Sequence, residues 1–225
     1  MTSRIALLPL AALFAACTSE TYDTGDGKYS YLRADFVEAR TDASCHLVSF
    51  TTDDGDQFAV SGTAAPTWMQ TPDSTYRALI YYNCSDASAS QNAQATIVST
   101  AQVLTLKPFS PRKVDVVKTD PVGFESVWTG TNGKYLNLSF TLKTGQSDGD
   151  SKGQTIGAVL DSISICPNGK RMAHIRFYHD QGGVPEYYSS RQYASIPVVA
   201  IDADSVALNI TSYSGQVTKR LGLKH

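Results

Sequence analysis

Hydrophobic and polar residues alternate along most of the chain in short runs that are separated by turn-forming residues. This period of two is typical of β-strands, and sustained helical spacing does not recur. The first part of the chain carries five such runs, at residues 29–40, 45–51, 57–60, 76–83 and 93–107. Asp54-Gly55 between the second and third runs is a strong hairpin signal. Five strands in about 80 residues match the strand count of an OB-type barrel, so an OB-like domain is predicted over 28–107.

A proline-interrupted stretch then breaks strand pairing, which predicts a linker over 108–121. Beyond it the alternation restarts in seven runs, at residues 125–129, 134–143, 155–165, 171–179, 186–201, 205–213 and 216–223. Asn132-Gly133 marks another hairpin. We therefore predict an all-β chain in which an immunoglobulin-like sandwich over 122–225 follows the barrel, although the Cys…Trp…Cys spacing of true immunoglobulin domains is missing. Trp128 is expected to anchor the core of this second domain.

The N-terminus has one basic residue followed by an apolar run that is too short to span a bilayer. The run ends at Phe14-Ala15-Ala16-Cys17, which resembles a bacterial lipobox. Residues 1–17 are thus predicted to be a lipoprotein signal with Cys17 as the acylated residue, and 18–27 a polar tether. The alternative is an ordinary signal cut near Ala16. Thr18 in place of Asp favours the outer membrane, facing either the periplasm or the outside.

Three other cysteines remain for an oxidising compartment. We predict a disulfide between Cys45 and Cys84 if their geometry allows it, and a free, buried thiol at Cys166. None of these cysteines lies in a metal-type spacing, so no metal and no cofactor are expected.

Charge and motifs exclude some functions. The chain has 19 basic and 21 acidic residues, and the predicted barrel is acidic, which argues against nucleic acid as a partner. No catalytic motif occurs, so catalytic residues are predicted to be none. His174 and His179 are an odd number of residues apart in a strand and should face opposite sides. The acidic residues Asp53, Asp54 and Asp56 are explained by a turn. Exposed tyrosines would suit a sugar or a protein partner, although tyrosine also simply fits strands.

Three segments, AQVLTLK (101–107), DPVGFESVWTGTNGKYLNLSFTLK (120–143) and HIRFYHDQGG (174–183), resemble the NigD-like lipoproteins of the Bacteroidetes. The resemblance implies an N-terminal lipid anchor, an OB-like domain and an immunoglobulin-like sandwich, and it implies no enzymatic activity. The expected function is that of a membrane-anchored envelope protein that binds a protein, peptide or glycan by a site still unknown. A bacteriocin-associated immunity or accessory factor is the alternative, and an uncharacterised enzyme ranks third.

Overall fold

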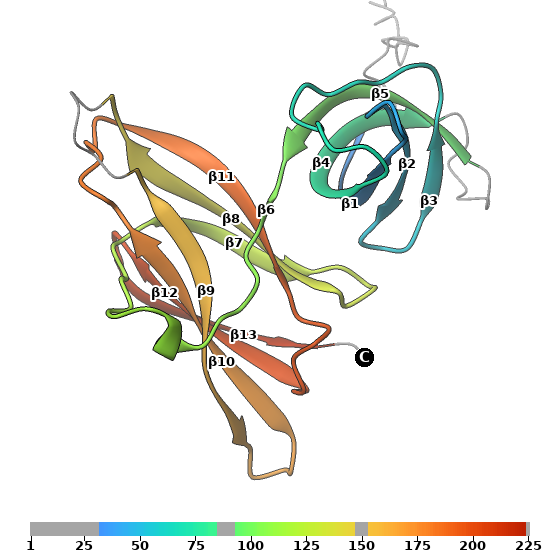
Figure 1. The fold of residues 1–225 in the computed structure, drawn as a ribbon. Helices are drawn as coiled ribbons and strands as arrows, with labels where there is room; N and C mark the ends of the chain where they lie inside the picture. Colours follow the sequence, from blue (N-terminus) through green and yellow to red (C-terminus); the bar gives the residue numbers. More distant parts are fainter. Residues whose placement is uncertain (1–31, 85–92, 147–152, 224–225) are drawn as a thin grey trace, which may run out of the picture.

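The computed structural model describes residues 32–84, 93–146, 153–223. The predicted signal, Cys17 and the tether lie outside this part of the chain. Within it, no helix is long and apolar enough to cross a membrane. The predicted all-β class is confirmed, because a closed five-stranded barrel is followed by two four-stranded sheets that pack as a sandwich (Figure 1).

The barrel has the strand order β1-β2-β3-β5-β4. Its strands are β1 (Leu32–Thr41), β2 (Leu47–Thr52), β3 (Gln57–Val60), β4 (Thr75–Cys84) and β5 (Ala93–Gln102). Alternate residues of these strands point inward, and three aromatic rings fill the centre. The ring centroids of Phe50, Phe58 and Tyr82 lie 4.9 to 5.1 Å from one another. The period-two pattern therefore gives the barrel an aromatic core.

The sandwich consists of the sheets β6-β11-β8-β7 and β13-β12-β10-β9. Its elements are β6 (Leu104–Thr105), a short 3-10 helix (Pro111–Lys113), β7 (Gly123–Thr129), β8 (Tyr135–Thr144), β9 (Thr155–Ile165), β10 (Arg171–Asp180), β11 (Tyr188–Pro197), β12 (Ser205–Ser212) and β13 (Gly215–Gly222). Leu136, Leu138, Phe140 and Leu142 project from β8 into the core between the sheets. The intervening residues of β8 project to the opposite face of the sheet, where Tyr135 and Asn137 contact the barrel.

The chain changes domain earlier than the predicted linker. β5 ends at Gln102, and Leu104 already pairs with Ala194 of β11 in the sandwich. The stretch 108–121 is also not a free connection, because Phe109 and Thr119 form isolated bridges to β9 and β10. In Figure 1 this segment runs along the sandwich in green.

Candidate binding site at the domain junction

Two hairpin turns meet where the domains touch. The β2–β3 turn and the β7–β8 turn both come from the Asp-Gly and Asn-Gly signals in the sequence. The amide of Asn132 donates to the carbonyl of Asp53 at 2.9 Å, and the Thr131 hydroxyl donates to Asp54 at 2.7 Å. A Cβ on Gly130 would lie only 2.4 Å from the Asp53 Cβ, so the close approach of the turns requires glycine at this position. The two turns therefore clasp the domains together.

A buried ion pair lies behind these turns. Arg77 of β4 is 6% exposed and Asp53 is 8% exposed. The Arg77 Nη1 donates to Asp53 Oδ1 at 2.7 Å, and Nη2 donates to Oδ2 at 2.5 Å, which makes a bidentate pair. Both residues belong to the barrel, but the remaining hydrogen bonds of their side chains come from the sandwich.

The sandwich completes the pair through two neutral side chains. Asn137 of β8 donates from Nδ2 to Asp53 at 2.6 Å and accepts from Arg77 at 3.0 Å. The Arg77 Nε donates to the Ser195 hydroxyl at 2.9 Å, and that hydroxyl donates to Asn137 at 2.7 Å. Asn137 and Ser195 are paired residues of β8 and β11, so their side chains share one sheet face. Since each buried polar group has a partner, the network fixes one orientation of the two domains.

A second polar contact lies next to this network. Glu38 of β1 accepts hydrogen bonds from Lys134 at 2.8 Å and from the Tyr135 hydroxyl at 2.9 Å. Burial of the Glu38 carboxyl disfavours its charge, but these two hydrogen bonds outweigh burial and lower its pKa. Burial and the bond to Glu38 raise the pKa of Tyr135 to about 12. The Arg77 guanidinium lies over the Tyr135 ring, 4.1 Å from its centroid.

Trp128 does not occupy the sandwich core, which corrects the expectation from the sequence. Its ring lies edge to face against Phe36 of the barrel, with 5.1 Å between centroids. The reason is the register: Trp128 pairs with Asn137, whose side chain faces the barrel, while the neighbouring Val127 pairs with Leu138 of the core. Trp128 is therefore a junction residue.

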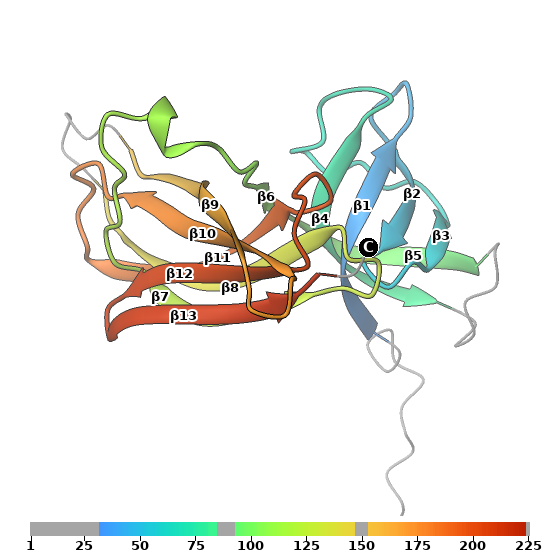
Figure 2. The same ribbon diagram turned by 90° about the horizontal axis from the view of Figure 1, so that it is seen from below.

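A hollow of about 350 Å³ opens beside this aromatic pair. Its walls come from both domains and combine aromatic, aliphatic and acidic side chains. The lining residues are Ala34, Asp35, Phe36, Asp53, Asp54, Leu79, Trp128, Thr129 and Gly130. Concave sites of this size, lined by apolar groups and a few fixed polar groups, commonly lie at domain interfaces. Figure 2 shows the β7–β8 turn reaching the barrel beside β1.

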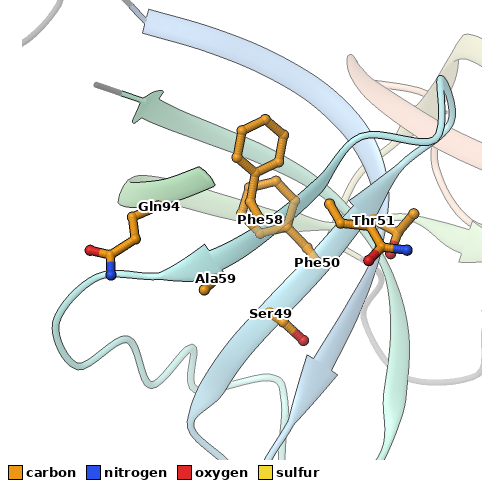
Figure 3. Close-up of a pocket in the computed structure, with 7 residues that line it drawn as sticks. Ser49, Phe50, Thr51, Phe58, Ala59 and Gln94 are labelled. Carbon is orange, nitrogen blue, oxygen red and sulfur yellow. The ribbon is translucent and has the colours of Figure 1, made fainter. Parts of the chain in front are cut away.

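A second hollow of similar volume lies on the barrel surface over β2 and β3 (Figure 3). It is lined by neutral polar side chains, including Ser49, Thr51, Gln57 and Gln94. Its two aromatic residues, Phe50 and Phe58, are only 2% exposed because their rings belong to the barrel core. The junction hollow thus offers more exposed aromatic surface and more varied chemistry, and we take it as the candidate site.

The predicted disulfide is contradicted by the structure, which shows Cys45 and Cys84 without a bond between them. The β1–β4 ladder runs from Arg40 opposite Thr75 to Leu32 opposite Asn83. Cys45 follows the end of the ladder at Arg40, and Cys84 lies next to Asn83 at the other end. The ends of this ladder are roughly 27 Å apart at about 3.4 Å per residue, whereas bridged Cα atoms lie within about 7 Å. Antiparallel pairing therefore separates the two residues.

The other singled-out residues lie away from the junction. Cys166 is only half-buried, in the turn after β9. His174 and His179 fall on opposite faces of β10, and His179 is fully buried with Nδ1 against the Asp120 carbonyl. Among the described residues, no group of three or more His, Cys, Asp or Glu is arranged to hold a metal ion. Of the three acidic residues in the β2–β3 turn, Asp53 is buried, whereas Asp54 is exposed and Asp56 is half-buried. The sequence did not indicate this difference.

Known proteins share this architecture. A NigD-like immunity protein from Bacteroides caccae is 23% identical, with a TM-score of 0.58 over 84% of this chain and 91% of that one. A protein of unknown function from Bacteroides vulgatus is 14% identical, with a TM-score of 0.66 over 86% and 92%. A putative lipoprotein from Bacteroides fragilis is 13% identical, with a TM-score of 0.58 over 86% and 98%. No protein-family model and no curated protein matches the sequence. The resemblance to NigD-like proteins is confirmed at the level of the fold.

Proposed function

We propose that this chain is a cell-envelope lipoprotein that acts as a non-catalytic binding protein, with the junction hollow as its ligand site. The observation that carries the proposal is the buried Arg77–Asp53 pair, whose partners in the sandwich fix the two domains that line the hollow. A site held in one shape binds without a further ordering cost.

The polar groups of the hollow are arranged to hold a ligand rather than to move protons. Asp53 is held by Arg77 and Asn137, while Asp54 accepts from Thr131. Asp35 accepts from the buried Tyr82 hydroxyl at 2.8 Å. These hydrogen bonds fix the direction of each carboxylate, which suits recognition.

The envelope location rests on residues 1–17 and on the lipoprotein name of the Bacteroides fragilis neighbour. We place the mature protein at the outer membrane, held by acyl chains on Cys17. Metabolic labelling with a fatty-acid analogue should mark the wild type, and Cys17→Ser should be unlabelled and move to the soluble fraction. A wild type without label would refute the anchor.

Binding at the hollow can be tested in living cells of the organism that encodes the protein. A photo-crosslinking amino acid placed at Thr129, in the lining of the hollow, should yield one defined adduct that mass spectrometry identifies. The same amino acid at Val116, which is 63% exposed on the segment along the sandwich, is the matched control and should not yield it. Identical adducts at both positions, or none at Thr129, would contradict the proposal.

The second candidate function is immunity against a peptide toxin, and the name of the Bacteroides caccae neighbour favours it. An immunity protein would occupy the toxin or shield its target, again without chemistry. Deletion of the gene should then sensitise cells to toxins secreted by competing strains. Unchanged growth in their culture supernatants would count against immunity and leave the general binding role standing.

A further inference from the structure

The hollow on the barrel surface is lined by polar side chains that have no partner within the protein. Ser49 and Thr51 come from β2, Gln57 comes from β3, and Gln94 comes from β5. Among the described residues, none of these four side chains makes a hydrogen bond to another group of the protein. Each of them can both donate and accept a hydrogen bond. The hollow therefore gathers four polar groups that are free to bind a ligand.

The strand registers bring these groups onto one outward face of the barrel. Ser49 lies opposite Ala59, and Ala59 lies opposite Gln94. Thr51 lies opposite Gln57 on the same face. Adjacent strands are about 5 Å apart, so the four polar side chains stand within the width of three strands. The small Ala59 side chain lies between Ser49 and Gln94 and forms the floor of the hollow (Figure 3).

The charge of the lining disfavours ionic and apolar ligands. None of the seven residues that the structure shows lining the hollow is charged, so an ionic ligand would find no counter-charge there. The adjacent strand β1 places Glu38 and Arg40 beside the hollow, and their opposite charges leave no net charge at that edge. An apolar ligand would remove water from the four polar groups without replacing its hydrogen bonds, which is unfavourable.

The closed barrel also disfavours an extended peptide. β2 pairs with β1 and β3, β3 pairs with β2 and β5, and β5 pairs with β3 and β4. These three strands therefore offer no free edge to which a peptide could add a strand. A ligand that carries several uncharged hydroxyl groups fits the hollow better than an ion, an apolar molecule or a peptide.

We propose that the barrel hollow binds an uncharged glycan. Neighbouring hydroxyl groups of a sugar donate and accept hydrogen bonds, as the side chains of the hollow do, and each glutamine amide offers both a donor and an acceptor. The volume of about 350 Å³ limits the contact to a short stretch of the glycan. Gln57 and Gln94 are exposed and lose rotamer freedom when they bind, so the affinity is modest. This second site does not depend on the function proposed for the junction hollow.

The test titrates neutral hexasaccharides into the chain from residue 18 onward and maps amide chemical shifts. The probes are cellohexaose, maltohexaose and mannohexaose, with an oligogalacturonate of the same length as the charged counterpart. At least one neutral probe should bind with a Kd of about 1 mM or below, with shifts centred on the lining residues of β2, β3 and β5. The oligogalacturonate should bind at least about tenfold more weakly. Absence of saturable shifts with all three neutral probes, or equal binding of the charged probe, would overturn the proposal.

Three variants locate the binding. Ala59→Leu fills the hollow from an exposed position and should weaken binding more than about tenfold. Gln94→Ala should weaken it about tenfold, whereas Gln102→Ala should leave it within about twofold. Gln102 is the matched control because it is an exposed glutamine of the same strand that lies outside the lining. Unchanged binding by Ala59→Leu, or equal effects of the two glutamine changes, would refute the site. Melting curves of all three variants should match the wild type.

The outcome is separable from that of the junction hollow. A defined crosslink at Thr129 in cells together with no glycan binding would retain the function proposed for the junction and refute the barrel site. Glycan-induced shifts centred on Trp128 and Thr129, which line the junction hollow, would place the glycan there and also refute the barrel site. Glycan binding without a crosslink would support the barrel site and refute the junction as a binding site.

Discussion

Arg77→Met should destabilise the domain junction more than the substitution of any other arginine in the barrel. The substitution preserves the length and much of the volume of the side chain but removes four hydrogen bonds, two to Asp53 and one each to Asn137 and Ser195. Asp53 would then be a buried carboxylate that keeps the Asn137 amide as a side-chain donor but has lost its counter-charge. Breaking a buried ion pair in this way costs about 3 to 5 kcal/mol.

The partner substitution separates the ion pair from simple loss of packing. Asp53→Leu should cost a similar amount, because it leaves the Arg77 charge buried. The double variant should cost clearly less than the sum of the two, since no isolated charge remains. A coupling energy of about 1.5 to 3 kcal/mol is expected from residues in one network. Arg77→Lys keeps the charge but loses the bidentate fork, and its cost should fall between that of wild type and Arg77→Met.

The chain contains two tryptophans in different environments, so their fluorescence can follow the barrel and the junction separately. Trp68 packs on the barrel, where its indole donates to Thr100, and Trp128 contacts Phe36 at the junction. Urea unfolding is followed in a Trp68→Phe background, where emission comes from the junction, and in a Trp128→Phe background, where it comes from the barrel. Arg77→Met should lower the urea midpoint at the junction most.

The matched control is Arg40→Met, which changes an exposed arginine on β1. It should alter the free energy of unfolding by less than about 0.5 kcal/mol. If Arg77→Met costs less than about 1 kcal/mol, the network does not hold the domains together as a buried ion pair would. Strict additivity of the Arg77 and Asp53 changes would lead to the same conclusion.

Three further predictions concern titration and thiols. Because the pKa of Glu38 is depressed in the folded state, its contribution to stability is present above about pH 4.5 and is lost as pH falls through the folded value, so Glu38→Gln should flatten the acid side of a plot of Tm against pH. Because the pKa of Tyr135 is raised, its phenol stays protonated at pH 10 and ionises at about pH 12. Ultraviolet difference titration should therefore show one late ionisation step in the wild type that Tyr135→Phe lacks. Thiol titration of the unfolded, unreduced chain from residue 18 onward should find three groups, at Cys45, Cys84 and Cys166, whereas a count of one would restore the predicted disulfide.

The alternating pattern by itself determined the strands and the order of barrel and sandwich. Period-two burial is a local property, so runs such as 134–143 could be assigned from their own residues, and β8 indeed spans Tyr135–Thr144. The Asp-Gly and Asn-Gly pairs determined two hairpins for the same reason, since their backbone preference depends on neighbours in sequence. Both turns lie where they were predicted.

Only the tertiary structure decided what the outward faces of these strands meet. Arg77 and Ser195 are 118 residues apart in the chain, and nothing local to either indicates the other. Their contact depends on the registers of the β1–β4 and β8–β11 ladders and on the docking of one closed barrel against one sheet face. The same registers moved Trp128 from the expected core to the junction and separated Cys45 from Cys84. Alternation states which residues share a face, but a face becomes core, junction or surface only through what packs on it, and that is a long-range outcome of the whole fold.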